Sequence, residues 1–157
     1  MVNIGRNVVY FSAPAMILVV GLCALFFIHK KSTFSCDADI LYFENNQMKG
    51  NLQLSLHLYY DNTGSFDLYG YANNPNTNST TKMARRVNFK YKKQNSIFFI
   101  EHTNTIKYNN DNTKDSMLPE FISSTQQIIN IEKLNGDNYI VYDKVSPAFT
   151  CKKNLNK

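Results

Sequence analysis

The residues that could carry chemistry are few and scattered in this sequence. His29, His57 and His102 lie far apart, and no His-x-x-x-His spacing, Cys-x-x-Cys spacing or cluster of carboxylates provides a metal site. There is no glycine-rich phosphate loop and no Gly-x-Ser-x-Gly element to hold a nucleophilic serine. Asp37 and Asp39 share one face of a predicted strand, where solubility is a commoner role than acid catalysis. The sequence therefore predicts no catalytic residue, metal ligand or cofactor, and a protein that is not an enzyme.

One basic run interleaved with aromatic residues is the only feature typical of nucleic-acid binding: Arg85, Arg86, Phe89, Lys90, Tyr91, Lys92 and Lys93. Residues 36–157 hold 14 Lys and Arg against 12 Asp and Glu, so they contribute only +2 to the net charge of +5. We therefore interpret the run as a solvated outer strand face whose lysines discourage edge pairing. No direct contact with nucleic acid is expected.

A membrane span is the clearest prediction. Residues 8–28 are 21 consecutive residues without a charge, and as a helix they would extend about 31 Å, close to the thickness of a bilayer core. A cleaved signal peptide would have a shorter apolar core followed by small residues, whereas this run ends at His29, Lys30 and Lys31. We predict a short cytoplasmic tail (1–7), an uncleaved transmembrane helix (8–28) and a juxtamembrane linker (29–35). The flanking charges do not fix its orientation.

Two cysteines remain after the predicted span, and they bracket the rest of the chain. A disulfide between Cys36 and Cys151 would tie the first strand to the last. Closing a loop of this length would stabilise the fold by about 4–5 kcal/mol, because it reduces the entropy of the denatured state. Such bonds persist in oxidising compartments. The alternative is two free thiols in a cytoplasmic domain. With the disulfide, residues 36–157 are the periplasmic domain of a single-pass protein of the bacterial inner membrane.

Apolar residues alternate with polar ones through most of this domain, which predicts β-strands. The leucines at 52, 54, 56 and 58 share one face, and a turn at 61–64 leads into a second alternating segment, 65–72. Further strands are predicted at 37–43, 83–93, 96–103, 127–133 and 138–145. Residues 73–81 and 109–116 are expected to be polar loops. A short helix is predicted near 118–127, and a type I′ turn at Asn135-Gly136.

Seven or eight strands joined mostly as hairpins favour an antiparallel meander. An open meander would expose two edges, whereas a barrel removes them and brings the first and last segments together. We therefore predict a mainly β domain: a small closed antiparallel barrel, with a two-sheet sandwich as the alternative. Its interior is either filled by side chains or leaves room for one apolar ligand.

The arrangement resembles the FidL-like family of small bacterial membrane proteins. The resemblance rests on the membrane helix and on short motifs: Cys36-x-Ala-x-Ile, Gly50-x-Leu-x-Leu, the glycines Gly64 and Gly70, Arg86-Val87-x-Phe-x-Tyr, and Tyr139 followed by Pro147-x-Phe149-x-Cys151. Such proteins are similar in organisation to ToxS- and VtrC-type co-components, which are single-span proteins with a lipocalin-like periplasmic domain.

The resemblance implies a partner and, with it, a function. The expected partner is a ToxR-like, membrane-anchored winged-helix transcription regulator, which the periplasmic barrel would bind and stabilise. The pair would form a pocket for a small amphipathic, bile-salt-like signal. The family supplies no motif for the contact residues, which stay unassigned. Two other functions compete: an envelope-assembly or structural protein, such as a pilus-associated subunit or anchored chaperone, and an anchored hydrolase with a site that the sequence does not reveal.

Overall fold

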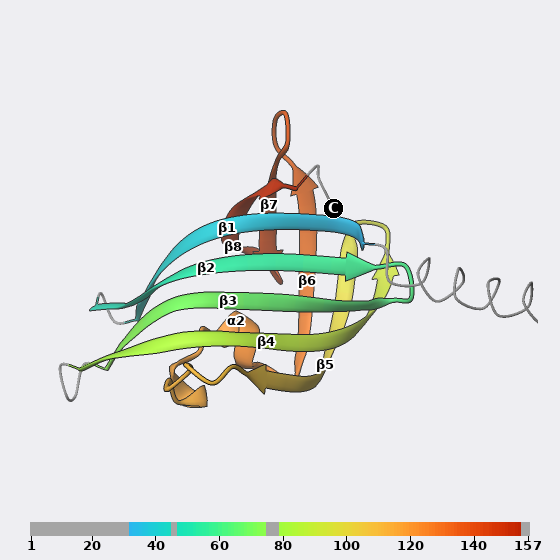
Figure 1. Cartoon of the computed structure of the whole chain (residues 1–157). Coiled ribbons are helices and arrows are strands. Elements are labelled where there is room, and N and C mark those ends of the chain that lie inside the picture. Colours follow the sequence, from blue (N-terminus) through green and yellow to red (C-terminus); the bar gives the residue numbers. More distant parts are fainter. Residues whose placement is uncertain (1–31, 45–46, 75–78, 155–157) are drawn as a thin grey trace, which may run out of the picture. The chain divides into compact units, whose positions relative to one another are not determined.

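The computed structural model describes residues 32–44, 47–74 and 79–154, and these residues form a closed antiparallel β-barrel (Figure 1). Each strand pairs with the next one along the chain, and the last strand pairs with the first. The described elements are, in order, β1 (Ser32–Glu44), β2 (Gln47–Tyr59), β3 (Thr63–Asn74), β4 (Ser79–Gln94), β5 (Ile97–Lys107), a 3-10 turn (Asp115–Met117), helix α2 (Glu120–Ser123), β6 (Gln126–Lys133), β7 (Asn138–Asp143) and β8 (Ser146–Lys153). Figure 1 shows β1 to β4 as long strands side by side, with β6 to β8 crossing them steeply.

The predicted cytoplasmic tail (1–7), transmembrane helix (8–28) and first part of the linker (29–31) lie outside the described residues. Among the residues that are described, no helix has the length and apolar character needed to cross a bilayer. Strand β1 begins at Ser32, so residues 32–35 of the predicted linker belong to the strand. The extension is stabilised by Phe34, whose ring packs edge-on against Tyr139 with centroids 5.1 Å apart.

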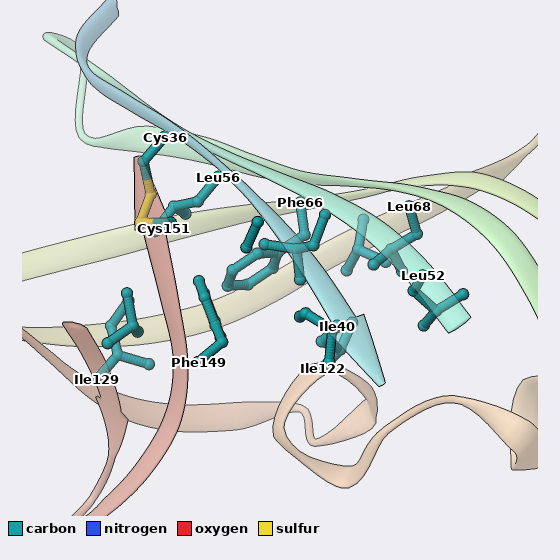
Figure 2. Close-up of a cluster of buried hydrophobic side chains, with 14 of the residues drawn as sticks. Cys36, Ile40, Leu52, Leu56, Phe66, Leu68, Ile122, Ile129, Phe149 and Cys151 are labelled. Carbon is teal, nitrogen blue, oxygen red and sulfur yellow. A yellow bond between two sulfur atoms is a disulfide. The ribbon is translucent and has the colours of Figure 1, made fainter. Parts of the chain in front are cut away.

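Alternating apolar residues fill the barrel interior, as their period of two predicts. The four leucines of β2, at 52, 54, 56 and 58, are at most 2% exposed, and burying a side chain of this size contributes about 1.5–3 kcal/mol. On the neighbouring strands, Phe66 and Phe89 pack with ring centroids 5.0 Å apart. Helix α2 contributes Ile122, which is fully buried beside Ile40 (Figure 2). Side chains therefore fill the centre of the barrel.

The mainly β fold, the strand number and the closure of the barrel are confirmed. The sandwich alternative is wrong, because β8 pairs with β1 and the described strands form one continuous sheet. The predicted hairpin of β6 and β7 is also confirmed. Its turn is not type I′, which would need a positive φ at both central residues, because only Gly136 (φ 53°) has one and Asn135 does not.

Most strand boundaries differ from prediction, and the last strand, β8, lies beyond the predicted segment 138–145. In two places the reason is that strand pairing continues further than composition indicates. The polar segment 73–81 is not all loop, since Asn73 and Asn74 pair with Thr80 and Ser79. The predicted helix at 118–127 is only the four-residue α2. It ends where the Ser124 hydroxyl donates to the Glu120 carbonyl (3.0 Å), and residues 126–133 are recruited into β6 by pairing with β5.

Candidate functional site

The closure of the barrel is its shortest strand pairing. Strands β1 and β8 are in register only at Cys36 with Lys153 and at Asp37 with Lys152. The Asn154 N–H adds a hydrogen bond to the Ser35 carbonyl (2.8 Å). By contrast, β3 is paired with β4 along its whole length, as hairpin strands usually are. We call this short β1–β8 junction the seam.

The predicted disulfide between Cys36 and Cys151 is confirmed, and it crosses the seam. Both cysteines point into the core, at 0% and 4% exposure, with their Cα atoms 5.5 Å apart. Figure 2 shows the sulfur–sulfur bond joining the first and last strands at one side of the buried cluster. Because so few backbone contacts hold these strands together, the covalent bond is the principal restraint on the seam. A bond across 115 residues also indicates an extracytoplasmic compartment.

Beyond Asp37 the two strands separate, and a groove opens between them. This seam groove has a volume of about 930 Å³. Its walls come from residues 40–43 of β1, residues 116–121 around α2 and residues 146–148 of β8. The residues that line it are Ile40, Leu41, Tyr42, Phe43, Lys49, Asn73, Lys114, Ser116, Met117, Leu118, Pro119, Glu120, Phe121, Asp143, Ser146, Pro147 and Ala148. The groove therefore combines an apolar surface with charged groups of both signs.

One side of the groove carries exposed apolar side chains. On β1, Leu41 is 57% exposed and Phe43 is 61% exposed. Across the groove, Phe121 and Ala148 are partly buried and pack against the core. Large apolar side chains that are exposed next to a concave surface are typical of sites that bind a partner or ligand.

The other side of the groove is formed by the segment that follows β5, which folds over the end of the barrel. Arg85 of β4 holds this segment in place. Its guanidinium donates to both carboxylate oxygens of Asp111, to Asp115 and to the Thr113 carbonyl, each at 2.7 Å. On the opposite side, the Tyr42 hydroxyl donates to the Met117 carbonyl (2.9 Å) and ties the segment to β1. We call residues 108–119 the plug.

The electrostatics of the plug follow from its burial. The side chains of Arg85 and Asp111 are both 0% exposed. Burial alone would raise the pKa of Asp111, but the Arg85 guanidinium and the backbone N–H groups of Ala84 and Thr113 lower that pKa below its ordinary value. The pKa of Asp115 is also lowered, first by the hydrogen bond from Lys107 and then by Arg85. The plug is therefore built around ionised carboxylates.

The position of Arg85 corrects the interpretation of the basic run. Arg85 does not lie on a solvated outer face, because it points inward with Val87 and Phe89 and is fully buried. The period of two contained this signal: Arg85 shares its parity with those apolar residues. Its neighbour Arg86 faces outward and makes a two-pronged contact with Asp67, at 2.5 and 2.8 Å. The three lysines of the run, at 90, 92 and 93, are exposed.

A polar chain across the outer face brings together residues that the sequence left apart. The Ser35 hydroxyl lies 2.9 Å from Nδ1 of His57, and Nε2 of His57 lies 3.5 Å from the Asp67 carboxylate. Serine, histidine and aspartate are the groups of a hydrolase triad. Here, however, both oxygens of Asp67 also bind Arg86, and Ser35 is only 3% exposed. Neither the seam groove nor the second groove described below is lined by Ser35 or His57.

The remaining candidates stay separate. Asp37 and Asp39 do lie on one face of β1, where Asp37 accepts a hydrogen bond from the Asn154 side chain (3.0 Å) and Asp39 is exposed. His102 points into the barrel next to β6, and burial lowers its pKa. In the described part of the chain, no three His, Cys, Asp or Glu side chains gather as a metal-binding set.

A second groove of about 730 Å³ lies on the outer face of β4, β5 and β6. It combines the exposed side chains of Phe99 and Ile128 with three lysines, at 90, 92 and 144. It does not reach the seam or the plug. Sequence reasoning did not identify either groove, because each is formed by strands that the register alone brings together.

The fold and the seam define a class of protein: a small, disulfide-closed antiparallel β-barrel with a filled core and a groove beside its closure. The family model described as FidL-like putative membrane protein matches residues 70–151, just over half of the 157-residue chain. The chain therefore belongs to the FidL-like family of membrane proteins. No curated protein and no solved structure matches it.

Proposed function

We propose that this protein is a non-enzymatic accessory subunit, anchored in the bacterial inner membrane by residues 8–28, whose periplasmic barrel binds and stabilises a partner. The proposed partner is a ToxR-like, membrane-bound winged-helix transcription regulator. The protein would thus work like the ToxS- and VtrC-type co-components that its sequence resembles, with a lipocalin-like barrel as the binding module.

The observation that carries this proposal is the seam groove. The barrel interior is filled, so binding falls to the surface, and this groove joins a cavity of about 930 Å³ to exposed Leu41 and Phe43. Membership of a membrane-protein family and the Cys36–Cys151 bond support an anchored, extracytoplasmic domain. Burial of Ser35 argues against a hydrolase at the polar chain of the outer face, because a nucleophile must be reached by its substrate.

The proposal includes a small amphipathic ligand, similar to a bile salt, which the same groove would hold when the partner covers it. Ligand pockets usually enclose 300–1,000 Å³ and combine apolar walls with a few polar groups. Lys114 would supply the charge that an acidic head group needs, while Leu118 and Phe121 would contact its apolar body.

The test is affinity purification of the full-length chain from detergent-solubilised native membranes, in which a membrane-anchored winged-helix regulator is sought by mass spectrometry. We expect the two to co-purify from detergent-solubilised membranes and the regulator's half-life to shorten when this chain is deleted. Failure to co-purify, with an unchanged half-life, would contradict the proposal. Co-purification with pilus or secretion components instead would favour the envelope-assembly alternative.

A further inference from the structure

The seam leaves part of a β-strand without a partner, and this determines what kind of molecule can bind there. In an antiparallel sheet, the N–H and C=O groups of successive residues point alternately to the two neighbouring strands. The Ser35 carbonyl accepts from Asn154, which follows β8, so Ser35 points toward β8. By alternation, the backbone groups of Asp37, Asp39, Leu41 and Phe43 point the same way.

Only the first part of this row is satisfied. Asp37 is in register with Lys152, but the pairing of β1 with β8 ends there. Among the described residues, no backbone partner faces Asp39, Leu41 or Phe43 on this side. The backbone groups of the intervening residues, Ala38, Ile40 and Tyr42, point the other way, into the long β1–β2 ladder. The free edge therefore belongs to a strand that is paired on its other side, with one register shift between Tyr42 and Phe43, and is not a frayed end.

The side chains around this edge have the pattern that an added strand would need. Facing inward, the groove offers Ile40, which is only 7% exposed, with Leu118 and Phe121 across from it. Facing outward, Leu41 and Phe43 are more than half exposed. A strand laid along residues 39–43 would thus bury alternate side chains in the groove and leave the others in contact with Leu41 and Phe43.

We propose that the free edge of β1, residues 39–43, binds an extended segment of the partner protein as an added ninth strand. This inference rests on the proposed function for the partner's identity. The pairing itself does not depend on that identity, because an extended segment of any protein supplies backbone donors and acceptors at the spacing of the β1 edge. The backbone provides affinity, and the apolar wall of the groove selects the partner's alternate side chains. A bound strand would also cover the gap that β1 and β8 leave open.

Photocrosslinking of the full-length chain in native membranes tests the proposal. A benzoylphenylalanine at Phe43 reports contact at the edge. The same probe at Leu134 is the matched control, because Leu134 is 54% exposed on the β6–β7 turn, away from the groove. We expect the probe at position 43 to form one major adduct, mapped by mass spectrometry to a single short segment of an extracytoplasmic protein domain. We expect no such adduct from position 134.

Two substitutions at Leu41 separate backbone pairing from apolar contact. Leu41→Pro removes an N–H on the free edge, which proline tolerates without breaking the β1–β2 ladder, whereas Leu41→Ser keeps the N–H and removes the apolar side chain. We expect Leu41→Pro to reduce the adduct from position 43 about tenfold or more, and Leu41→Ser to reduce it much less. Unfolding by urea checks that both variants keep the wild-type stability of the barrel. In addition, amide exchange at residues 39–43 is expected to slow in the complex.

Each outcome decides between the two proposals. If the adduct contains a protein other than a winged-helix regulator and still depends on the Leu41 N–H, edge pairing is supported and the proposed function fails. If a regulator co-purifies but crosslinks equally from position 134, or if Leu41→Ser and Leu41→Pro have the same effect, edge pairing is overturned. Adducts only with lipid or with a second copy of this chain would overturn it as well.

Discussion

The ion pair that holds the plug gives the sharpest test of how this barrel is stabilised. Replacing Arg85 by methionine keeps most of the side-chain volume but removes four hydrogen bonds and, among the described residues, the one positive charge in contact with Asp111. The side chain of Asp111 is 0% exposed, so its carboxylate would remain buried, with the N–H groups of Ala84 and Thr113 as its donors among the described residues. Breaking a buried ion pair from one side typically costs about 3–5 kcal/mol.

Urea unfolding, followed by circular dichroism at neutral pH, measures this loss for Arg85→Met. The matched control is Arg86→Met, the next residue on the opposite face, whose guanidinium contacts Asp67 but is 39% exposed. Its loss is expected to be smaller, about 1–2 kcal/mol. Amide exchange adds a local reading: in Arg85→Met, residues 108–119 should exchange faster than the strands, because the substitution releases the plug before the barrel.

A second substitution makes the reasoning refutable. Asp111→Asn in the Arg85→Met background removes the stranded charge, so the double variant should be more stable than the sum of the two single losses predicts, by about 1–3 kcal/mol. A loss below about 1 kcal/mol for Arg85→Met, or strictly additive losses in the double variant, would show that the buried pair does not hold the plug.

Further expectations follow from the same contacts. Reducing the disulfide, or replacing Cys36 and Cys151 by alanine, should lower the free energy of unfolding by about 4–5 kcal/mol. As a control, reductant should not change the free energy of unfolding of the double-alanine variant. A loss below about 1 kcal/mol would contradict the assignment of the bond to the seam. The pKa of Asp111 is lower in the folded than in the unfolded protein, so ionised Asp111 contributes its full stabilisation well above pH 3.8. This stabilisation is lost as the pH falls from there through the folded-state pKa, so the free energy of unfolding should fall less steeply with acid in Asp111→Asn than in the wild type. Equal slopes would contradict the link between Asp111 ionisation and stability. The side-chain amide of Gln127 has no hydrogen-bond partner for its nitrogen or its oxygen among the described residues, although the residue is only 4% exposed. Gln127→Leu should therefore leave Tm unchanged or raise it. A clear fall in Tm would mean that this amide is hydrogen-bonded.

Much of the fold could be predicted because its signals are local. The leucines of β2 alternate with polar residues, and this pattern alone places them in the core. The two bracketing cysteines predicted both the closure and the compartment. The burial of Arg85 was equally local, but treating residues 85–93 as one basic run hid the parity that pairs Arg85 with Val87.

The candidate site could not be predicted in the same way, because it depends on where pairing stops. No property of Asp37 or Asp39 indicates that β8 separates from β1 between them. The contact of His57 with Asp67 depends on the register of β2 with β3, and that register is set by the turn that Asn62 makes at φ 59°. Such features belong to the geometry of the closed barrel and not to any segment alone.

The Cys36–Cys151 disulfide holds an oxidised, extracytoplasmic barrel closed across its seam. Maleimide-polyethylene glycol labelling of the full-length chain, denatured in detergent directly from native membranes with thiol exchange blocked, tests this claim most directly. The sequence has three cysteines, Cys23, Cys36 and Cys151, so each added label gives a separate gel shift. We predict one label, on Cys23, before reduction and three after it. Three labels before reduction would contradict the account.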